Sequence, residues 1–172
     1  MSTGRGRVAG VDVTFSVAKS GSAWWELADG GTQAAIFEAH QAAMAACLRL
    51  LEAEVAATRI GKNGVAQAEV RGLVAASFDH WDSRAGDPHL HTHVVVANRV
   101  QAAHGAWRTL DSRALYRCVV PVSATYHGLL PDHLSLPFGV AWAPRHRPHS
   151  PVPSWRIPRF PADFPTRLPT PS

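Results

Sequence analysis

The stretch Phe78-Asp-His-Trp-Asp-Ser-Arg-Ala-Gly-Asp-Pro-His-Leu-His-Thr-His93 holds four of the chain's ten histidines. The segment Leu90-His-Thr-His-Val-Val-Val-Ala97 is typical of a β-strand, and side chains two residues apart on a strand point to the same face. His91 and His93 are therefore expected to share one face, about 6.6–6.8 Å apart along the strand.

His80 ends the apolar run that precedes this strand, and residues 82–88 between them are rich in turn formers. We expect the two runs to pair as an antiparallel hairpin with His80 opposite His91, which puts Phe78 opposite His93. All three histidines then face the same way. A slip of one residue would turn His80 to the other face.

Three imidazoles on one face form a set of neutral nitrogen donors. Such a set leaves coordination positions open, which suits a catalytic metal better than a structural one. The pattern predicts that His80, His91 and His93 bind one divalent ion. The alternative is a solvated cluster of histidines on a strand.

The bulk composition indicates a single domain, since 172 residues are enough for a substantial core. No apolar run approaches the roughly 20 residues of a membrane span, so we expect no membrane insertion. Residues 1–7 lack the apolar stretch of a signal peptide, and Cys47 and Cys118 are isolated. These features predict a reduced, cytoplasmic protein with free thiols.

The net charge of +4 at pH 7 comes from one end of the chain. Residues 1–143 hold 12 Lys and Arg against 12 Asp and Glu, whereas residues 144–172 hold five Arg and one Asp. Nine of the 13 prolines also lie in residues 144–172. We expect this end to be a disordered tail. Nucleic-acid binding by residues 1–143 would need a local basic patch.

The segment before the histidine hairpin predicts a strand and two helices. Val11-Asp-Val-Thr-Phe-Ser16 alternates strictly, which indicates a half-buried strand. After a turn at 19–22, a short helix is expected at 24–27. A long helix is expected over 33–58, with Thr32 as N-cap and one apolar stripe that includes His40. We interpret His40 as a hydrogen-bonded core histidine rather than a ligand.

Further elements complete an α+β pattern. Short strands are expected at 65–71 and 107–110, and the hairpin strands at 73–81 and 89–100. A helix is expected to start at Asp111, with Pro121 and Pro131 near the ends of a helical segment or breaking it. The predicted fold is a two-layer sandwich whose central antiparallel sheet carries the histidines on one face and helices on the other.

Asp12 is expected on the open face of that sheet. Val11, Val13 and Phe15 would face the long helix, so Asp12 would share a layer with the histidines. A carboxylate there would orient an imidazole through its second nitrogen or take a proton. The alternative is a solvated carboxylate on an exposed face.

Two motifs of the sequence resemble those of a known family. Gly10-Val-Asp-Val-Thr-Phe-Ser-Val-Ala-Lys-Ser20 and Phe78-x-His-x-x-Ser-Arg-x-x-Asp-Pro-x-Leu-His-x-His93 are similar to two motifs of MobF-class conjugative relaxases, the TraI and TrwC type of HUH endonuclease. The order of long helix, metal hairpin and Gly105-x-Trp-x-Thr-Leu110 also fits. The resemblance covers roughly residues 10–143, and we treat residues 1–143 as a partial relaxase domain, with 144–172 as the tail.

The resemblance implies a function. These enzymes nick one strand of DNA at a plasmid transfer origin with a tyrosine nucleophile, and three histidines hold a divalent metal that polarises the scissile phosphate. It implies that a bound Mg, Mn or Zn ion is held by His80, His91 and His93, with Asp12 as the acidic residue beside them. It implies partners as well, namely single-stranded DNA, relaxosome proteins and the conjugative secretion proteins.

This chain departs from the family in one respect that bears on activity. The family's nucleophilic tyrosines precede the block around Asp12, whereas Tyr116 and Tyr126 follow the metal motif and match nothing catalytic. We therefore expect a truncated relaxase domain that keeps metal binding and weak DNA binding but lacks the nucleophile. No helicase part is expected.

Two other functions compete with a relaxase fragment. His89-Leu-His-Thr-His-Val-Val95 also resembles the signature of histidine-triad nucleotide hydrolases, although His80 has no place in that family. The other is a non-catalytic module that binds single-stranded DNA. The residues expected to contact DNA, in either a relaxase or a binding module, are Lys19, Arg84, Arg99 and Trp107.

Overall fold

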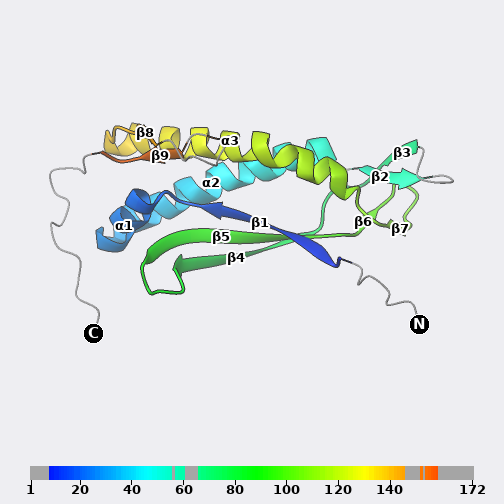
Figure 1. The fold of residues 1–172 in the computed structure, drawn as a ribbon, viewed down its shortest axis with the longest axis horizontal. Helices are drawn as coiled ribbons and strands as arrows, with labels where there is room; N and C mark the ends of the chain where they lie inside the picture. The colour runs from blue at the N-terminus through cyan, green and yellow to red at the C-terminus, as the bar shows by residue number, and fades with distance from the viewer. Residues whose placement is uncertain (1–7, 56, 61–65, 146–151, 153, 159–172) are drawn as a thin grey trace.

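The structure is a computed structural model, and it describes residues 8–55, 57–60, 66–145, 152 and 154–158. Its centre is an antiparallel sheet in the order β1-β5-β4 (Figure 1). The three strands are β1 (Gly10–Ser16), β4 (Ala75–Asp82) and β5 (Pro88–Ala97). The described residues also form three helices, α1 (Lys19–Leu27), α2 (Gly30–Val55) and α3 (Ser112–Phe138).

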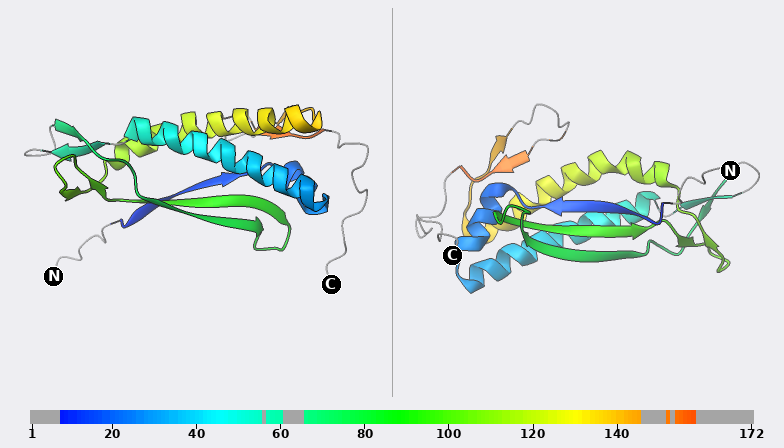
Figure 2. Two further views of the ribbon diagram at one scale, coloured as in Figure 1. Left: turned by 180° about the vertical axis from the view of Figure 1, so that it is seen from behind. Right: turned by 60° about the horizontal axis from the view of Figure 1, so that its bottom comes forward.

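The sheet and the helices form two layers. Figure 2 shows α2 and α3 behind the three strands, so they cover one face of the sheet while the other face carries no described element. The core between the layers is built from buried side chains of β1, β5, α2 and α3, among them Phe15, Val94, Ile36 and Leu134. The predicted two-layer α+β sandwich is confirmed.

The strand β1 shows the expected alternation. Phe15 is buried against the helices, whereas Asp12 and Thr14 are exposed on the other side. On β5, Leu90, Thr92, Val94 and Val96 are all buried in the same way. Each strand therefore has one face in the core and one face open, because successive strand residues point to opposite sides.

The helix α2 is shifted towards the N-terminus relative to its prediction. Asp29 caps it, since its Oδ1 accepts hydrogen bonds from Gly31 N at 2.9 Å and Thr32 N at 3.1 Å. Thr32 therefore lies in the first turn and its hydroxyl donates to Asp29, so its prediction as N-cap was wrong. The helix ends at Val55, and Ala57–Ile60 forms strand β2 instead of continuing it.

The helix α1 begins earlier than predicted. Residues 19–22, expected as a turn, form its first turn. Ser22 accounts for this, because its buried hydroxyl donates to Val17 O and accepts from Leu90 N at 3.1 Å. These two bonds anchor the helix start to the end of β1 and to β5, which local sequence preference does not reveal.

The helix α3 runs without interruption through Pro121 and Pro131, so the prediction that they lie near its ends or break it was wrong. A proline inside a helix removes one hydrogen bond and costs about 3 kcal/mol. Packing offsets that cost, because α3 buries a continuous stripe against the core: Leu115, Val122, Tyr126, Leu130 and Leu134. Asp111 caps the start, and Gly139, in the left-handed conformation, ends the helix.

Smaller strand pairs flank the sheet. At one end lie the pairs β2 with β3 (Ala66–Glu69) and β6 (Val100–Gln101) with β7 (Trp107–Arg108) (Figure 1). The predicted strands at 65–71 and 107–110 correspond to β3 and β7, while the strand expected over 89–100 divides at Asn98 and Arg99 into β5 and β6.

The start of the proline-rich end is packed, contrary to the predicted tail. The strands β8 (Ala143–Arg145) and β9 (Ser154–Arg156) pair with each other. Val152 and Ile157 are buried, and Ile157 N donates to Ser20 Oγ at 3.0 Å. Contacts of β9 with α1 and α3, together with the burial of Ile157 in the core, stabilise a segment whose composition alone indicates disorder. Residues 146–151, 153 and 159–172 of the predicted tail lie outside the described residues.

Two other predictions concern single residues and the membrane. His40 is fully buried and hydrogen-bonded, as expected of a core histidine. Cys47 and Cys118 are free thiols. No helix within the described part of the chain is long and apolar enough to cross a membrane.

Candidate metal centre

The three predicted histidines lie together on the open face of the sheet. His80 pairs with His91, and Phe78 pairs with His93, so the predicted register is confirmed. On the other side of β5, Ser16 pairs with His91 and Thr14 with His93. The strands β4 and β5 therefore bring the three histidines to one end of the face, beside the end of β1.

The spacing of the three imidazole rings fits a single ion. Ring centroids are 5.1 Å apart for His80 and His91, 5.3 Å for His80 and His93, and 5.1 Å for His91 and His93. A tetrahedral zinc with Zn–N distances of 2.0–2.1 Å places the centroids of its imidazole ligands about 5.2 Å apart. Donor type and spacing therefore both fit a metal.

The orientation of the rings differs from that of a formed metal site. The rings of His80 and His91 are stacked with their planes 20° apart. No three His, Cys, Asp or Glu side chains in the described ranges have their donor atoms gathered as metal ligands. Rotation about the side-chain bonds is needed for the donors to converge, and the assignment of the three histidines as ligands stays a prediction.

Hydrogen bonds at Nδ1 fix the tautomer of two of the rings. His93 Nδ1 lies 2.7 Å from Asp12 Oδ2, and His91 Nδ1 lies 2.6 Å from the carbonyl oxygen of His89. Both oxygens only accept, so each Nδ1 carries the proton when the ring is neutral. The lone pair is then on Nε2 of each ring, which is the arrangement of metal-bound histidines with an orienting partner.

Asp12 lies where the sequence placed it, on the histidine face of β1. It pairs with Val95 in the sheet, and its side chain reaches along the face to His93. Thr14 Oγ1 is a second neighbour of the same nitrogen at 3.2 Å. The sequence analysis did not single out Thr14, although its position two residues from Asp12 on an alternating strand places it on the same face.

His89 also lies beside the site. Its ring stacks on His91 with centroids 4.5 Å apart, and burial, followed by the nearby His91 and Lys19, lowers its pKa. A histidine held neutral in this way adds no repulsion to a cation bound by the other rings. His89 was not assigned as a ligand from the sequence, and the structure gives its ring no such role.

The residues expected to contact DNA form two groups at opposite ends of β5. Lys19 lies near the hairpin turn, where its ammonium is 3.4 Å from Asp87, and exposed Arg84 is in the turn itself. Arg99 and Trp107 lie at the far end, beyond Ala97. A β-strand of ten residues is about 33 Å long, so one DNA strand would have to run along the histidine face to meet both groups.

Arg99 and Trp107 share a surface hollow of about 930 Å³ with two residues that the sequence analysis did not assign to DNA contacts. Arg108 and Tyr116 line the same hollow, and residues Trp107 and Tyr116 are 53% and 65% exposed. Two guanidinium groups beside two exposed rings match the chemistry of sites that stack bases and bind phosphates.

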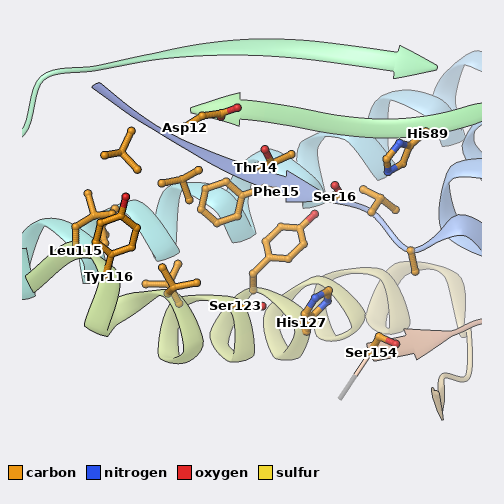
Figure 3. A pocket seen from close by; sticks show the side chains of 18 of the residues that line it. Asp12, Thr14, Phe15, Ser16, His89, Leu115, Tyr116, Ser123, His127 and Ser154 are labelled. Atoms are coloured by element: carbon orange, nitrogen blue, oxygen red, sulfur yellow. The ribbon is translucent and has the colours of Figure 1, made fainter. Parts of the chain in front are cut away.

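Neither tyrosine of the chain lies on the histidine face. A cavity of about 690 Å³ lies between β1 and α3, and both Asp12 and Tyr116 line it. In Figure 3 Tyr116 rises from α3 on one side of β1, whereas Asp12 lies on the other side. Tyr126 is buried and hydrogen-bonded to His40, and burial raises its pKa. Neither phenol is therefore assigned as a nucleophile.

Comparison with known proteins gives a family match. Residues 2–167 match the model of a family described as TrwC relaxase, a match that extends past residue 143, where we expected the relaxase-like region to end. The multifunctional conjugation protein TraI of Escherichia coli is 43% identical over 104 residues, and TraI of strain K12 is 41% identical over 104 residues. Each alignment covers 60% of this chain and 6% of the relative.

Solved structures of a relaxase share the fold. A copper-bound structure of the conjugative relaxase TrwC in complex with oriT DNA superposes with a TM-score of 0.73 at 28% identity, over 91% of this chain and 51% of that one. TrwC complexed with a 27-mer DNA that comprises the recognition hairpin and the cleavage site gives 0.72 at 28% identity, over 87% and 50%. This chain thus spans about half the length of those structures. The histidine-triad alternative gains no support.

Proposed function

The chain belongs to the TrwC relaxase family, and from that premise we propose that it acts in metal-dependent, site-specific nicking of single-stranded DNA at a transfer origin. The observation that carries this proposal is the set of three imidazoles at 5.1–5.3 Å spacing on an open sheet face. The TrwC structures in complex with oriT DNA, among them a copper-bound and a metal-bound one, support it.

We assign His80, His91 and His93 as the metal ligands. Their nitrogen donors favour zinc over magnesium, with manganese between them. When bound, a divalent ion at this place supplies Lewis-acid polarisation of a phosphate oxygen. Asp12 acts as a positioning residue, because its bond to His93 Nδ1 holds the Nε2 lone pair towards the open face.

The two basic groups at the ends of β5 would hold the DNA. Lys19 and Arg84 contact phosphates near the hairpin turn, and Arg99 contacts a phosphate near the hollow, where Trp107 stacks on a base. A DNA strand bound by both groups would cross the three histidines. Affinity from these contacts is electrostatic in large part, so it falls as salt concentration rises.

The proposed nucleophile, partners and location follow from membership of the family. The nucleophile of the nicking step would be a tyrosine outside the motifs described above, since Tyr116 and Tyr126 lie off the histidine face. The partners would be single-stranded origin DNA, relaxosome proteins and the conjugative secretion proteins, and the location would be the cytoplasm. A module that binds single-stranded DNA without nicking it is the second candidate, favoured by the hollow at Arg99 and Trp107.

The test uses the 172-residue chain and calorimetric titration with Mn²⁺ and with Zn²⁺. We expect one ion per chain for the unaltered protein and no measurable binding for the variant His80→Ala, His91→Ala, His93→Ala. The matched control is His104→Ala, which removes an exposed histidine far from the site and should leave binding unchanged. Equal metal binding by the triple variant would remove the proposed metal site.

The same proteins are then titrated with labelled single-stranded DNA, with and without Mn²⁺. Metal-dependent DNA affinity that is lost in the triple variant supports the relaxase centre. DNA affinity that is independent of metal and of the three histidines, but is lost on changing Arg99 and Trp107 to Ala, supports the binding module instead.

A further inference from the structure

A chain of polar side chains crosses the buried face of the sheet directly beneath the histidines. Tyr126 Oη lies 2.6 Å from His40 Nδ1, and His40 Nε2 lies 2.8 Å from Thr92 Oγ1. Thr92 Oγ1 lies 2.5 Å from Asp79 Oδ1, which also accepts from Gln41 Nε2 at 3.0 Å. These contacts join α3, α2, β5 and β4.

The direction of each hydrogen bond in this series can be assigned by starting from Asp79, the residue at its end. The Asp79 carboxylate accepts, so the Thr92 hydroxyl donates to it and must accept from His40 Nε2–H. His40 Nδ1 then carries the lone pair that accepts from the Tyr126 hydroxyl. This assignment requires a neutral His40, and burial lowers its pKa to about 4. Every hydrogen bond in the series therefore has one defined donor and one defined acceptor.

The position of the series in the sheet is what links it to the metal site. Thr92 stands between His91 and His93 on β5, and Asp79 is its direct partner on β4, next to His80. The bond between Thr92 and Asp79 thus ties β4 to β5 between the His80–His91 pair and the Phe78–His93 pair.

The position of strand β4 depends on a side-chain hydrogen bond of this kind more than the position of β5 does. All eight residues of β4 are exposed, and the register with β5 shifts just after His80. On the helix side, Trp81 stacks on Trp25 with centroids 5.5 Å apart, which holds the end of the strand. The hydrogen bond between Thr92 and Asp79 fixes β4 at a second point, the residue before His80.

We propose that His40 and Thr92 are positioning residues of the metal centre. Resting on the proposed function, this inference adds that the buried face of β5 sets the metal geometry on the open face. The Thr92 hydroxyl, oriented by His40, fixes Asp79 and thereby the distance and angle of His80 relative to His91 and His93. Loss of a group hydrogen-bonded to a metal ligand typically weakens affinity about 10–100-fold, and Thr92 acts one residue further away, through Asp79, so its loss should cost less, about 3–10-fold.

The test compares Thr92→Val, which removes the hydroxyl and keeps the shape, with Thr92→Ser, which keeps the hydroxyl. Affinity for Zn²⁺ and the visible absorption of bound Co²⁺ are measured at a temperature where circular dichroism shows every variant folded. We expect about 3–10-fold weaker binding and a changed Co²⁺ spectrum for Thr92→Val. Thr92→Ser should stay close to the unaltered protein.

Two further variants separate positioning from general loosening of the core. Val94→Ala removes a side chain that is buried on the same face of β5 and is also next to His93, so it should lower the melting temperature without changing the Co²⁺ spectrum. The combined variant His40→Leu, Thr92→Val, Tyr126→Phe removes the polar atoms together. It should regain stability relative to Thr92→Val yet keep the weakened metal affinity.

Unchanged metal affinity and spectrum in Thr92→Val, or an equal loss in Val94→Ala, would overturn the inference while leaving the proposed function intact. If the unaltered chain bound no metal, the proposed function would fail instead. The role of the Thr92–Asp79 bond can then still be tested by nuclear Overhauser contacts between the rings of His80 and His91. These contacts should be present in the unaltered chain and lost in Thr92→Val. Their persistence in that variant would also overturn the inference.

Discussion

The two faces of β5 differ in burial and in the use of their polar groups. Leu90, Thr92, Val94 and Val96 have at most 1% of their surface exposed, whereas the His93 side chain is 33% exposed and Val95 is 40% exposed. The buried face holds one polar side chain, Thr92, with a partner on each side. On the open face the polar groups are histidines with nitrogen lone pairs directed away from their partners.

This difference shows how one strand serves stability and chemistry at once. A polar group on the buried face must be satisfied within the protein, because an unpaired one costs about 1–3 kcal/mol. A group on the open face keeps unused capacity that a ligand can take. Alternation along a single strand therefore places hydrogen-bonded, buried side chains directly behind the side chains that can bind a ligand.

The largest expected effect is on the buried face. Leu90→Ala should lower the free energy of unfolding by about 2–5 kcal/mol, because it leaves a cavity in a close-packed core. Val95→Ala, on the open face of the same strand, is the matched control and should change it by less than about 0.5 kcal/mol. Urea denaturation midpoints measure both values. Similar losses for the two variants would show that the faces do not differ as described.

The next effect is the pH dependence contributed by His40. Burial, the main cause, and to a lesser extent His91 lower its pKa from 6.5 to about 4, although Asp79 opposes the shift. A histidine with a lowered pKa in the folded state contributes full stability above pH 6.5 and loses it as pH falls towards 4, because only the unfolded chain gains the proton. The loss amounts to about 3 kcal/mol.

This pH dependence is measured by comparing the unaltered chain with His40→Gln. The free energy of unfolding of the unaltered chain should fall more steeply between pH 6.5 and pH 4.5. The variant is less stable at pH 7 but lacks this titration, so its slope should be smaller. Parallel slopes would mean that His40 is not held neutral on the buried face.

The smallest expected effect is on the open face. Asp12→Ala removes the acceptor at His93 Nδ1 and should weaken metal affinity about 10–100-fold, whereas Asp12→Asn keeps a neutral acceptor and should lose less. Both variants should unfold at nearly the unaltered urea midpoint, since Asp12 is about half exposed. Calorimetric titration with Zn²⁺ measures the affinity. Unchanged affinity in Asp12→Ala would leave Asp12 without its positioning role.

Much of the candidate site was predictable because its signals are local. A turn between two apolar runs predicts a hairpin, and the two-residue spacing of His91 and His93 predicts a shared face. The strict alternation around Asp12 likewise assigned its face. In contrast, the helix starts at residues 19 and 30 were misplaced, because Ser22 and Asp29 act through hydrogen bonds that composition does not show.

The sequence by itself determined which residues share a face, since strand alternation follows from backbone geometry. It also determined the hairpin and the set of three histidines. Only the tertiary structure decided which of the three rings Asp12 meets, namely His93, 81 residues away, and that His40 and Tyr126 support Thr92. It alone decided that α3 continues through its prolines and that β8 and β9 pack. The physical reason is that these outcomes depend on contacts between distant segments, whose packing energy outweighs local preference.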